Sequence, residues 1–89
     1  MNKLEEARVK IDEIDSGLRD LFVKRMQVVI DVAKYKKENG LPILNEEREL
    51  EVIKKNLGSL KEEQLKPYYE EFLIECMRIS KEYQKELIK

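Results

Sequence analysis

A cationic side chain interrupts an apolar helical repeat early in the chain. From Leu4 to Tyr35, the positions spaced alternately three and four residues apart are apolar or aromatic, except Arg25. This spacing is typical of a long helix that packs along its length. Lys36 follows Arg25 by eleven residues, which at ~100° per residue is within ~20° of three full turns. The two cations therefore share a helix face, about 16 Å apart along the axis, and could hold opposite ends of one small dianion.

Two further groups of polar residues have helical spacing. Asn45, Arg48 and Glu49 share one face of a second segment, and Ser80 and Gln84 share one face of a third. Each group alone is typical of a solvated surface. Together with Arg25 they predict an apolar helical bundle with one polar, mostly cationic interior pocket. Buried cations need compensating charge, which Glu49 and an anionic ligand would supply.

Composition excludes several kinds of chemistry. The 89-residue chain has no histidine, so it lacks the commonest metal ligand and any Ser-His or Cys-His nucleophile system. We therefore expect no metal site and no histidine-dependent nucleophile. The single cysteine, Cys76, cannot form an intrachain disulfide, and its apolar neighbours predict a buried thiol.

Charge and hydropathy exclude several kinds of partner. The net charge is −1, which gives no indication of nucleic-acid binding. The longest apolar runs are three residues, too short to span a membrane. The charged N-terminus is unlike a signal peptide. We therefore expect a cytoplasmic protein that contacts neither nucleic acid nor membrane.

Helix-breaking residues divide the chain into three helical segments. They fall at 39–42 and at Gly58-Ser59, which predicts helices over 4–38, 46–57 and 60–88 in one all-α domain, 1–89. Asn45 is a suitable N-cap for the second helix, and Gly58 is expected to end it. Ser59 and Glu62 match a capping box that would open the third. Pro67 either separates a short leading turn from this helix or lies in its first turn.

The first helix is too long for one chain to cover. About 34 residues at 1.5 Å each give roughly 50 Å, whereas a compact chain of this size is about 30 Å across. The apolar ends would protrude, with either Ile11 and Ile14 or Val28 and Val32 exposed. We therefore expect an obligate oligomer, most simply an intertwined homodimer. Arg8 lies ~100° around the helix from Arg25, so we assign it to the pocket of the partner chain.

The combination of these residues resembles the all-helical, type II chorismate mutases. The shared local sequences are IDEID at 11–15, AKYK at 33–36, Pro42-Ile43 and ISKEYQ at 79–84. No single motif is specific, but the polar residues occur in register along essentially the whole chain. The resemblance implies three helices per chain with a long first helix, in an intertwined dimer. It also implies a cofactor-free [3,3] rearrangement of chorismate to prephenate, in phenylalanine and tyrosine biosynthesis.

The resemblance further implies a role for each polar residue. Arg25 and Arg8 of the partner subunit would bind the two carboxylates of chorismate, with Ser80 helping at the ring carboxylate. Lys36 and Gln84 would donate hydrogen bonds to the ether oxygen of the breaking C–O bond. These interactions would hold the reactive conformer and stabilise the charge that develops on the oxygen.

The remaining implied contacts lie on the second helix. Glu49 would accept a hydrogen bond from the ring hydroxyl near the Asn45 backbone, and Arg48 would add positive potential. Some family members carry aspartate where this chain has Asn45. The family contact there largely involves backbone, so we expect little loss.

Two other functions compete with this interpretation. An isochorismate-pyruvate lyase resembles the same fold and uses a similar cationic pocket, although the full set of polar residues favours the mutase. A non-catalytic helical interaction module would explain the heptad spacing but not Arg25 within it. The sequence leaves open whether the domain works alone, within a larger enzyme, or in association with another aromatic-pathway enzyme. It also leaves feedback regulation open.

Overall fold

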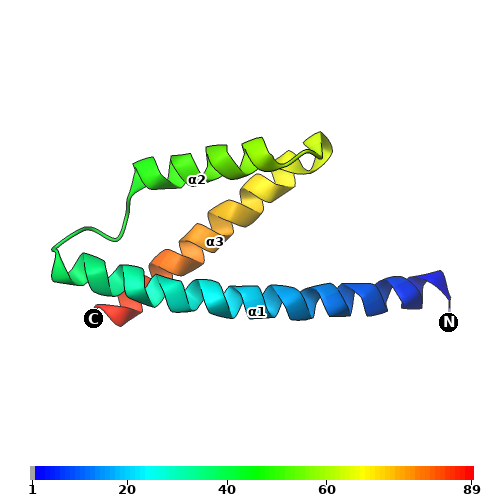
Figure 1. The fold of residues 1–89 in the computed structure, drawn as a ribbon, viewed down its shortest axis with the longest axis horizontal. Helices are drawn as coiled ribbons and strands as arrows, with labels where there is room; N and C mark the ends of the chain where they lie inside the picture. Colours follow the sequence, from blue (N-terminus) through cyan, green and yellow to red (C-terminus); the bar gives the residue numbers. More distant parts are fainter. Residues whose placement is uncertain (1) are drawn as a thin grey trace.

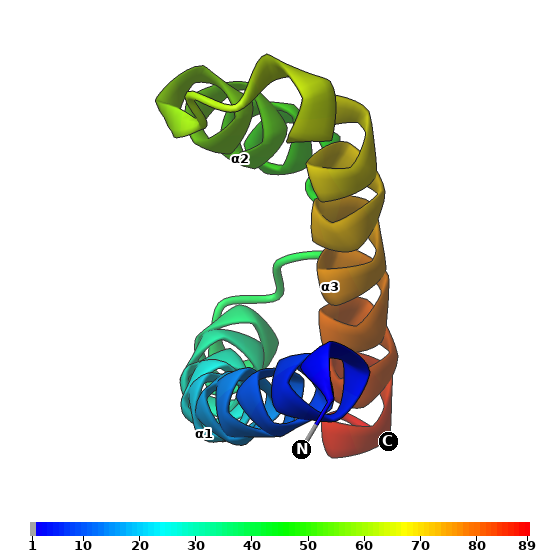
Figure 2. The same ribbon diagram turned by 90° about the vertical axis from the view of Figure 1, so that its right-hand side faces the viewer.

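The computed structural model describes residues 2–89, and every regular element among them is helical. In chain order these are α1 (Lys3–Glu38), α2 (Glu46–Ser59), a short 3₁₀ turn η1 (Glu63–Leu65) and α3 (Lys66–Leu87). Within these residues α3 packs against both α1 and α2, whereas the backbones of α1 and α2 do not approach each other closely. Figures 1 and 2 show α3 bridging the other two helices, so the molecule is open on one side. No helix in residues 2–89 is long and apolar enough to cross a bilayer.

Local hydrogen bonds explain where α1 begins and ends. The Asn2 side chain accepts a 2.8 Å hydrogen bond from the Glu5 amide, which satisfies one of the free donors of the first turn. At the other end Gly40 has φ +63°, a left-handed conformation that suits glycine. The Leu41 amide then donates to the Lys36 carbonyl at 2.8 Å. The Gly40 amide also donates to the Lys37 carbonyl at 3.4 Å, and the two hydrogen bonds form a Schellman motif that turns the chain sharply after α1.

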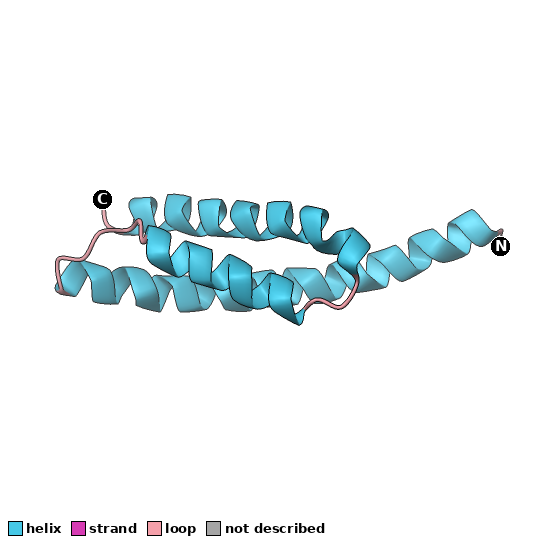
Figure 3. Ribbon diagram, turned by 90° about the horizontal axis from the view of Figure 1, so that it is seen from above, coloured by secondary structure: helices cyan, strands magenta, loops and turns pink. Residues whose placement is uncertain are grey.

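Much of α1 is uncovered in the single chain, as predicted. The structure measures 55 × 26 × 15 Å, and the N-terminal half of α1 extends past the other helices (Figure 3). Ile14 is 61% exposed, and Ile11, Val28 and Val32 are also exposed. The buried apolar core is small: Val29, Ala33, Leu73 and Met77. The predicted long helix with exposed apolar ends is therefore confirmed for the isolated chain.

The boundary between the second and third helices differs from the prediction. Gly58 does not end α2, because the helix continues to Ser59, whose hydroxyl donates to the Lys55 carbonyl at 3.1 Å. The hydroxyl is therefore used inside α2, and the predicted capping box with Glu62 does not form. The third helix begins at Lys66, not at residue 60. Pro67 lies in its first turn, where its missing N–H costs no helical hydrogen bond.

The environment of Cys76 also differs from the prediction. We expected a buried thiol, but Cys76 is half-buried in this chain. It lines an apolar groove between α1 and α3 together with Leu21, Phe22 and Phe72. In the single chain, the side chains around Cys76 therefore do not bury the thiol completely.

Candidate functional site

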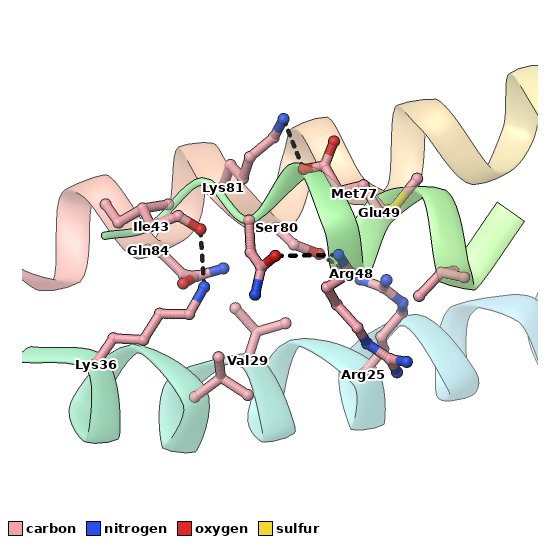
Figure 4. Close-up of a pocket in the computed structure, with 13 residues that line it drawn as sticks. Arg25, Val29, Lys36, Ile43, Arg48, Glu49, Met77, Ser80, Lys81 and Gln84 are labelled. Carbon is pink, nitrogen blue, oxygen red and sulfur yellow. Dashed lines mark hydrogen bonds and ion pairs between the residues drawn. The ribbon is translucent and has the colours of Figure 1, made fainter. Parts of the chain in front are cut away.

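A pocket of about 190 Å³ lies where the three helices face one another. Its apolar wall includes Val29 on α1 and Met77 on α3, both buried core residues. The structure brings seven of the eight predicted site residues to this one pocket: Arg25, Lys36, Asn45, Arg48, Glu49, Ser80 and Gln84. Figure 4 shows side chains from α1, α2 and α3 entering it.

Arg25 and Ser80 connect α1 with α3 at one side of the pocket. The Arg25 guanidinium donates a hydrogen bond to Ser80 Oγ. Ser80 is 7% exposed, and its hydroxyl donates in turn to the Cys76 carbonyl one turn earlier, at 2.8 Å. The serine thereby satisfies its polar atoms within the core. It also holds the guanidinium against the pocket, where it can bind an anion.

Lys36 and Gln84 meet at the opposite side (Figure 4). Lys36 Nζ donates to the Ile43 carbonyl at 2.8 Å, so the loop after α1 fixes the position of the ammonium. Gln84 is 5% exposed, and its Oε1 atom is buried without a hydrogen-bond partner. A buried unsatisfied polar atom is costly. A ligand could relieve this cost only with a donor such as a hydroxyl, because an amide oxygen accepts hydrogen bonds.

The first turn of α2 contributes the remaining predicted residues. The Asn45 side chain caps the helix by accepting a 3.0 Å hydrogen bond from the Arg48 amide. The Arg48 side chain is largely exposed and pairs with Glu51 on the same helix. Glu49 instead faces α3, where its Oε2 atom lies 2.9 Å from Lys81 Nζ. The cap therefore fixes the register that directs Glu49 toward α3.

Lys81 lines the pocket but was not among the predicted site residues. It lies three residues before Gln84, a spacing that places both side chains on one helix face. That spacing from Gln84 was the signal in the sequence that could have indicated Lys81. Arg8 shows the opposite case, because it lies exposed on the protruding half of α1, outside the pocket. Within one chain it cannot reach Arg25.

Charge in the pocket is strongly unbalanced. Four cations line it, against the single carboxylate of Glu49: Arg25, Lys36, Arg48 and Lys81. Outside the pocket, α3 carries an exposed pair in which the hydrogen bond from Arg78 lowers the pKa of Glu75. The same hydrogen bond raises the pKa of Arg78. The excess positive charge of the pocket favours an anionic ligand.

The fold and the pocket together define a three-helix protein with one pocket in which cationic side chains predominate. Residues 7–85 match the chorismate mutase type II family, and the chain belongs to that family. No solved structure matches the chain.

Curated relatives match about half of the chain. A chorismate mutase of Methanocaldococcus jannaschii is 45% identical over 49 residues, which cover 55% of this chain and 50% of that protein. A T-protein of Haemophilus influenzae is 42% identical over 53 residues, 60% of this chain and 14% of the relative. A 3-dehydroquinate dehydratase of Pyrobaculum aerophilum is 40% identical over 48 residues, 54% of this chain and 16% of the relative. The matched regions thus span half or less of each relative.

Proposed function

We propose that this chain is a chorismate mutase that converts chorismate to prephenate in aromatic amino-acid biosynthesis. The observation that carries the proposal is the convergence of Lys36 and Gln84 on one side of a cationic pocket. The Gln84 side chain is 5% exposed, so its amide is held inside the pocket, and the Lys36 ammonium is fixed by one loop carbonyl. Membership of the chorismate mutase type II family supports the same substrate.

The proposed chemistry is a unimolecular [3,3] rearrangement. The ether C–O bond of chorismate breaks while a C–C bond forms between the enolpyruvyl methylene and the ring, so no atom or proton is exchanged with the protein. The protein must hold the folded conformer and stabilise negative charge as it develops on the ether oxygen. Lys36 and Gln84 would donate hydrogen bonds to that oxygen. These donors bind the transition state more strongly than the substrate, which lowers the barrier.

The other residues would bind the ends of the substrate. Arg25, held by Ser80, would bind a carboxylate in a charge-assisted pair. Glu49 would accept a hydrogen bond from the ring hydroxyl, near the Asn45 backbone. Arg48, now paired only with an exposed carboxylate on its own helix, would add positive potential.

We further propose that two chains intertwine as a homodimer. A compact monomer of 10.7 kDa exposes about 5,500 Å², whereas this chain exposes 7527 Å². The excess is about 2,000 Å² per chain, or about 4,000 Å² for two chains. Obligate interfaces bury about 2,000–5,000 Å² in total, so the excess is large enough for one. Arg8 would then enter the pocket of the partner and bind the second substrate carboxylate.

The direct test is to add chorismate and follow the loss of its ultraviolet absorbance, with prephenate identified by chromatography. We expect turnover with a chelator present, because the proposed chemistry uses no metal. Lys37→Ala, at the exposed neighbour of Lys36, is the control for nonspecific loss of charge. Absence of turnover by the folded wild-type protein would refute the proposal. Release of pyruvate from isochorismate, without conversion of chorismate, would instead identify the lyase.

A further inference from the structure

One ion pair in the described residues connects different parts of the tertiary fold. Lys81 Nζ on α3 lies 2.9 Å from Glu49 Oε2 on α2. Every other ion pair within residues 2–89 joins residues three apart in sequence. The side chains of Lys81 and Glu49 are each only 27% exposed. Isolated pairs on a surface contribute little, but this pair is partly shielded and lines the pocket.

The pair also determines where the Glu49 carboxylate lies. Among the described residues Lys81 is its one ion-pair or hydrogen-bond partner, and it engages only Oε2. The other oxygen, Oε1, is therefore left to accept a hydrogen bond from a ligand. Without Lys81, the carboxylate would be drawn to the other cations of the pocket, Arg25, Lys36 and Arg48. It would then neutralise the charges that hold the ligand.

We propose that Lys81 is a positioning residue that orients Glu49 to accept a hydrogen bond from a hydroxyl of the substrate. Lys81 thereby selects hydroxyl-bearing substrates through Glu49 without contacting them. This inference rests on the proposed function, because it takes the hydroxyl to be that of the chorismate ring. It adds a second group to the recognition of that hydroxyl, one that comes from α3 and not from the helix that carries Glu49.

The expected size of the effect follows from the contact that is lost. A hydrogen bond to a charged group is worth roughly ten- to a hundredfold in an equilibrium. Lys81→Met keeps the length of the stem and removes only the ammonium, so Glu49 stays but loses its orientation. We expect kcat/KM for chorismate to fall about tenfold, mainly through KM. Lys81→Arg, which keeps a cationic donor, should recover most of the activity.

The experiment is a double-mutant cycle measured with chorismate. Lys81→Met and Glu49→Gln are made singly and together, with Lys85→Met as the matched control. Lys85 lies one turn further along α3 and makes only an exposed pair with Glu82. We expect Lys81→Met to have less than a twofold effect in the Glu49→Gln background and on an analogue without the ring hydroxyl. The Lys85→Met protein should match the wild type.

Each outcome supports or overturns a distinct claim. Wild-type turnover of chorismate tests the proposed function, whereas the comparison among variants tests the role of Lys81. Near-native kcat/KM in Lys81→Met would overturn the inference, and so would an equal loss with and without Glu49. Circular dichroism shows whether the variants fold. Should Lys81→Met not fold, Lys81→Gln in the same cycle tests the same dependence on Glu49.

Discussion

Removing one exposed apolar side chain from α1 should weaken the proposed dimer by a predictable amount. Ile14 is 61% exposed in the single chain. Burying a whole isoleucine side chain is worth about 1.5–3 kcal/mol, so covering the exposed part would give roughly 1–2 kcal/mol per chain. A symmetric dimer contains the contact twice, which makes about 2–4 kcal/mol. Ile14→Ala should therefore raise the dimer dissociation constant roughly 30-fold to several hundredfold.

The assay is sedimentation with fluorescence detection, on labelled chains from nanomolar to micromolar concentration. Glu13→Ala changes the neighbouring, exposed residue without removing apolar area, and it should leave association unchanged. A wild-type chain that stays monomeric and fully active at micromolar concentration would refute the reasoning. So would an Ile14→Ala chain that dissociates no more readily than the Glu13→Ala control.

Three further predictions concern the pocket. Lys36→Ala should lower kcat about 10²–10³-fold with a smaller change in KM; a near-native kcat would eliminate its role at the ether oxygen. Gln84→Glu should lose activity near pH 7.5 and regain it on acidification, because a carboxyl group donates only when protonated; a flat pH–rate profile would remove Gln84 from that contact. Mixing inactive Arg8→Ala and Lys36→Ala chains should restore part of the activity, because a heterodimer would contain one pocket without either defect. Continued inactivity despite demonstrated subunit exchange would show that Arg8 does not act in trans.

Periodicity and helix-breaking residues were enough to predict the long helix and its exposed ends. The breaks in the chain around Gly40 and the cap at Asn45 act locally, so sequence spacing predicts them well. The region near Gly58 was harder, because a Ser-x-x-Glu pattern predicts a cap only if the serine hydroxyl is not already used. In the structure Ser59 donates to Lys55 in the preceding helix, and the predicted cap fails for that reason.

Helical spacing was also enough to predict which polar residues share a face on each helix of the pocket. Ser80 and Gln84 stood out because polar residues on an apolar face need an explanation, and both are buried. Lys81 did not stand out, because a lysine beside such a face is usually solvated. Its significance depends on Glu49, which lies 32 residues earlier in sequence and meets it only through the packing of α2 on α3. A contact of that kind depends on interhelical geometry, which periodicity does not specify.

The two hydrogen bonds of Lys36 have a consequence for local opening of the chain. Its carbonyl accepts from the Leu41 amide, and its ammonium donates to the Ile43 carbonyl. One residue thus secures the same short loop through backbone and side chain together. The ammonium has two further donors, so a bound ligand can accept from it while the Ile43 contact holds the loop closed. Slower amide hydrogen exchange at Leu41 on adding a ligand would then report, without any catalytic assay, that binding stabilises this loop.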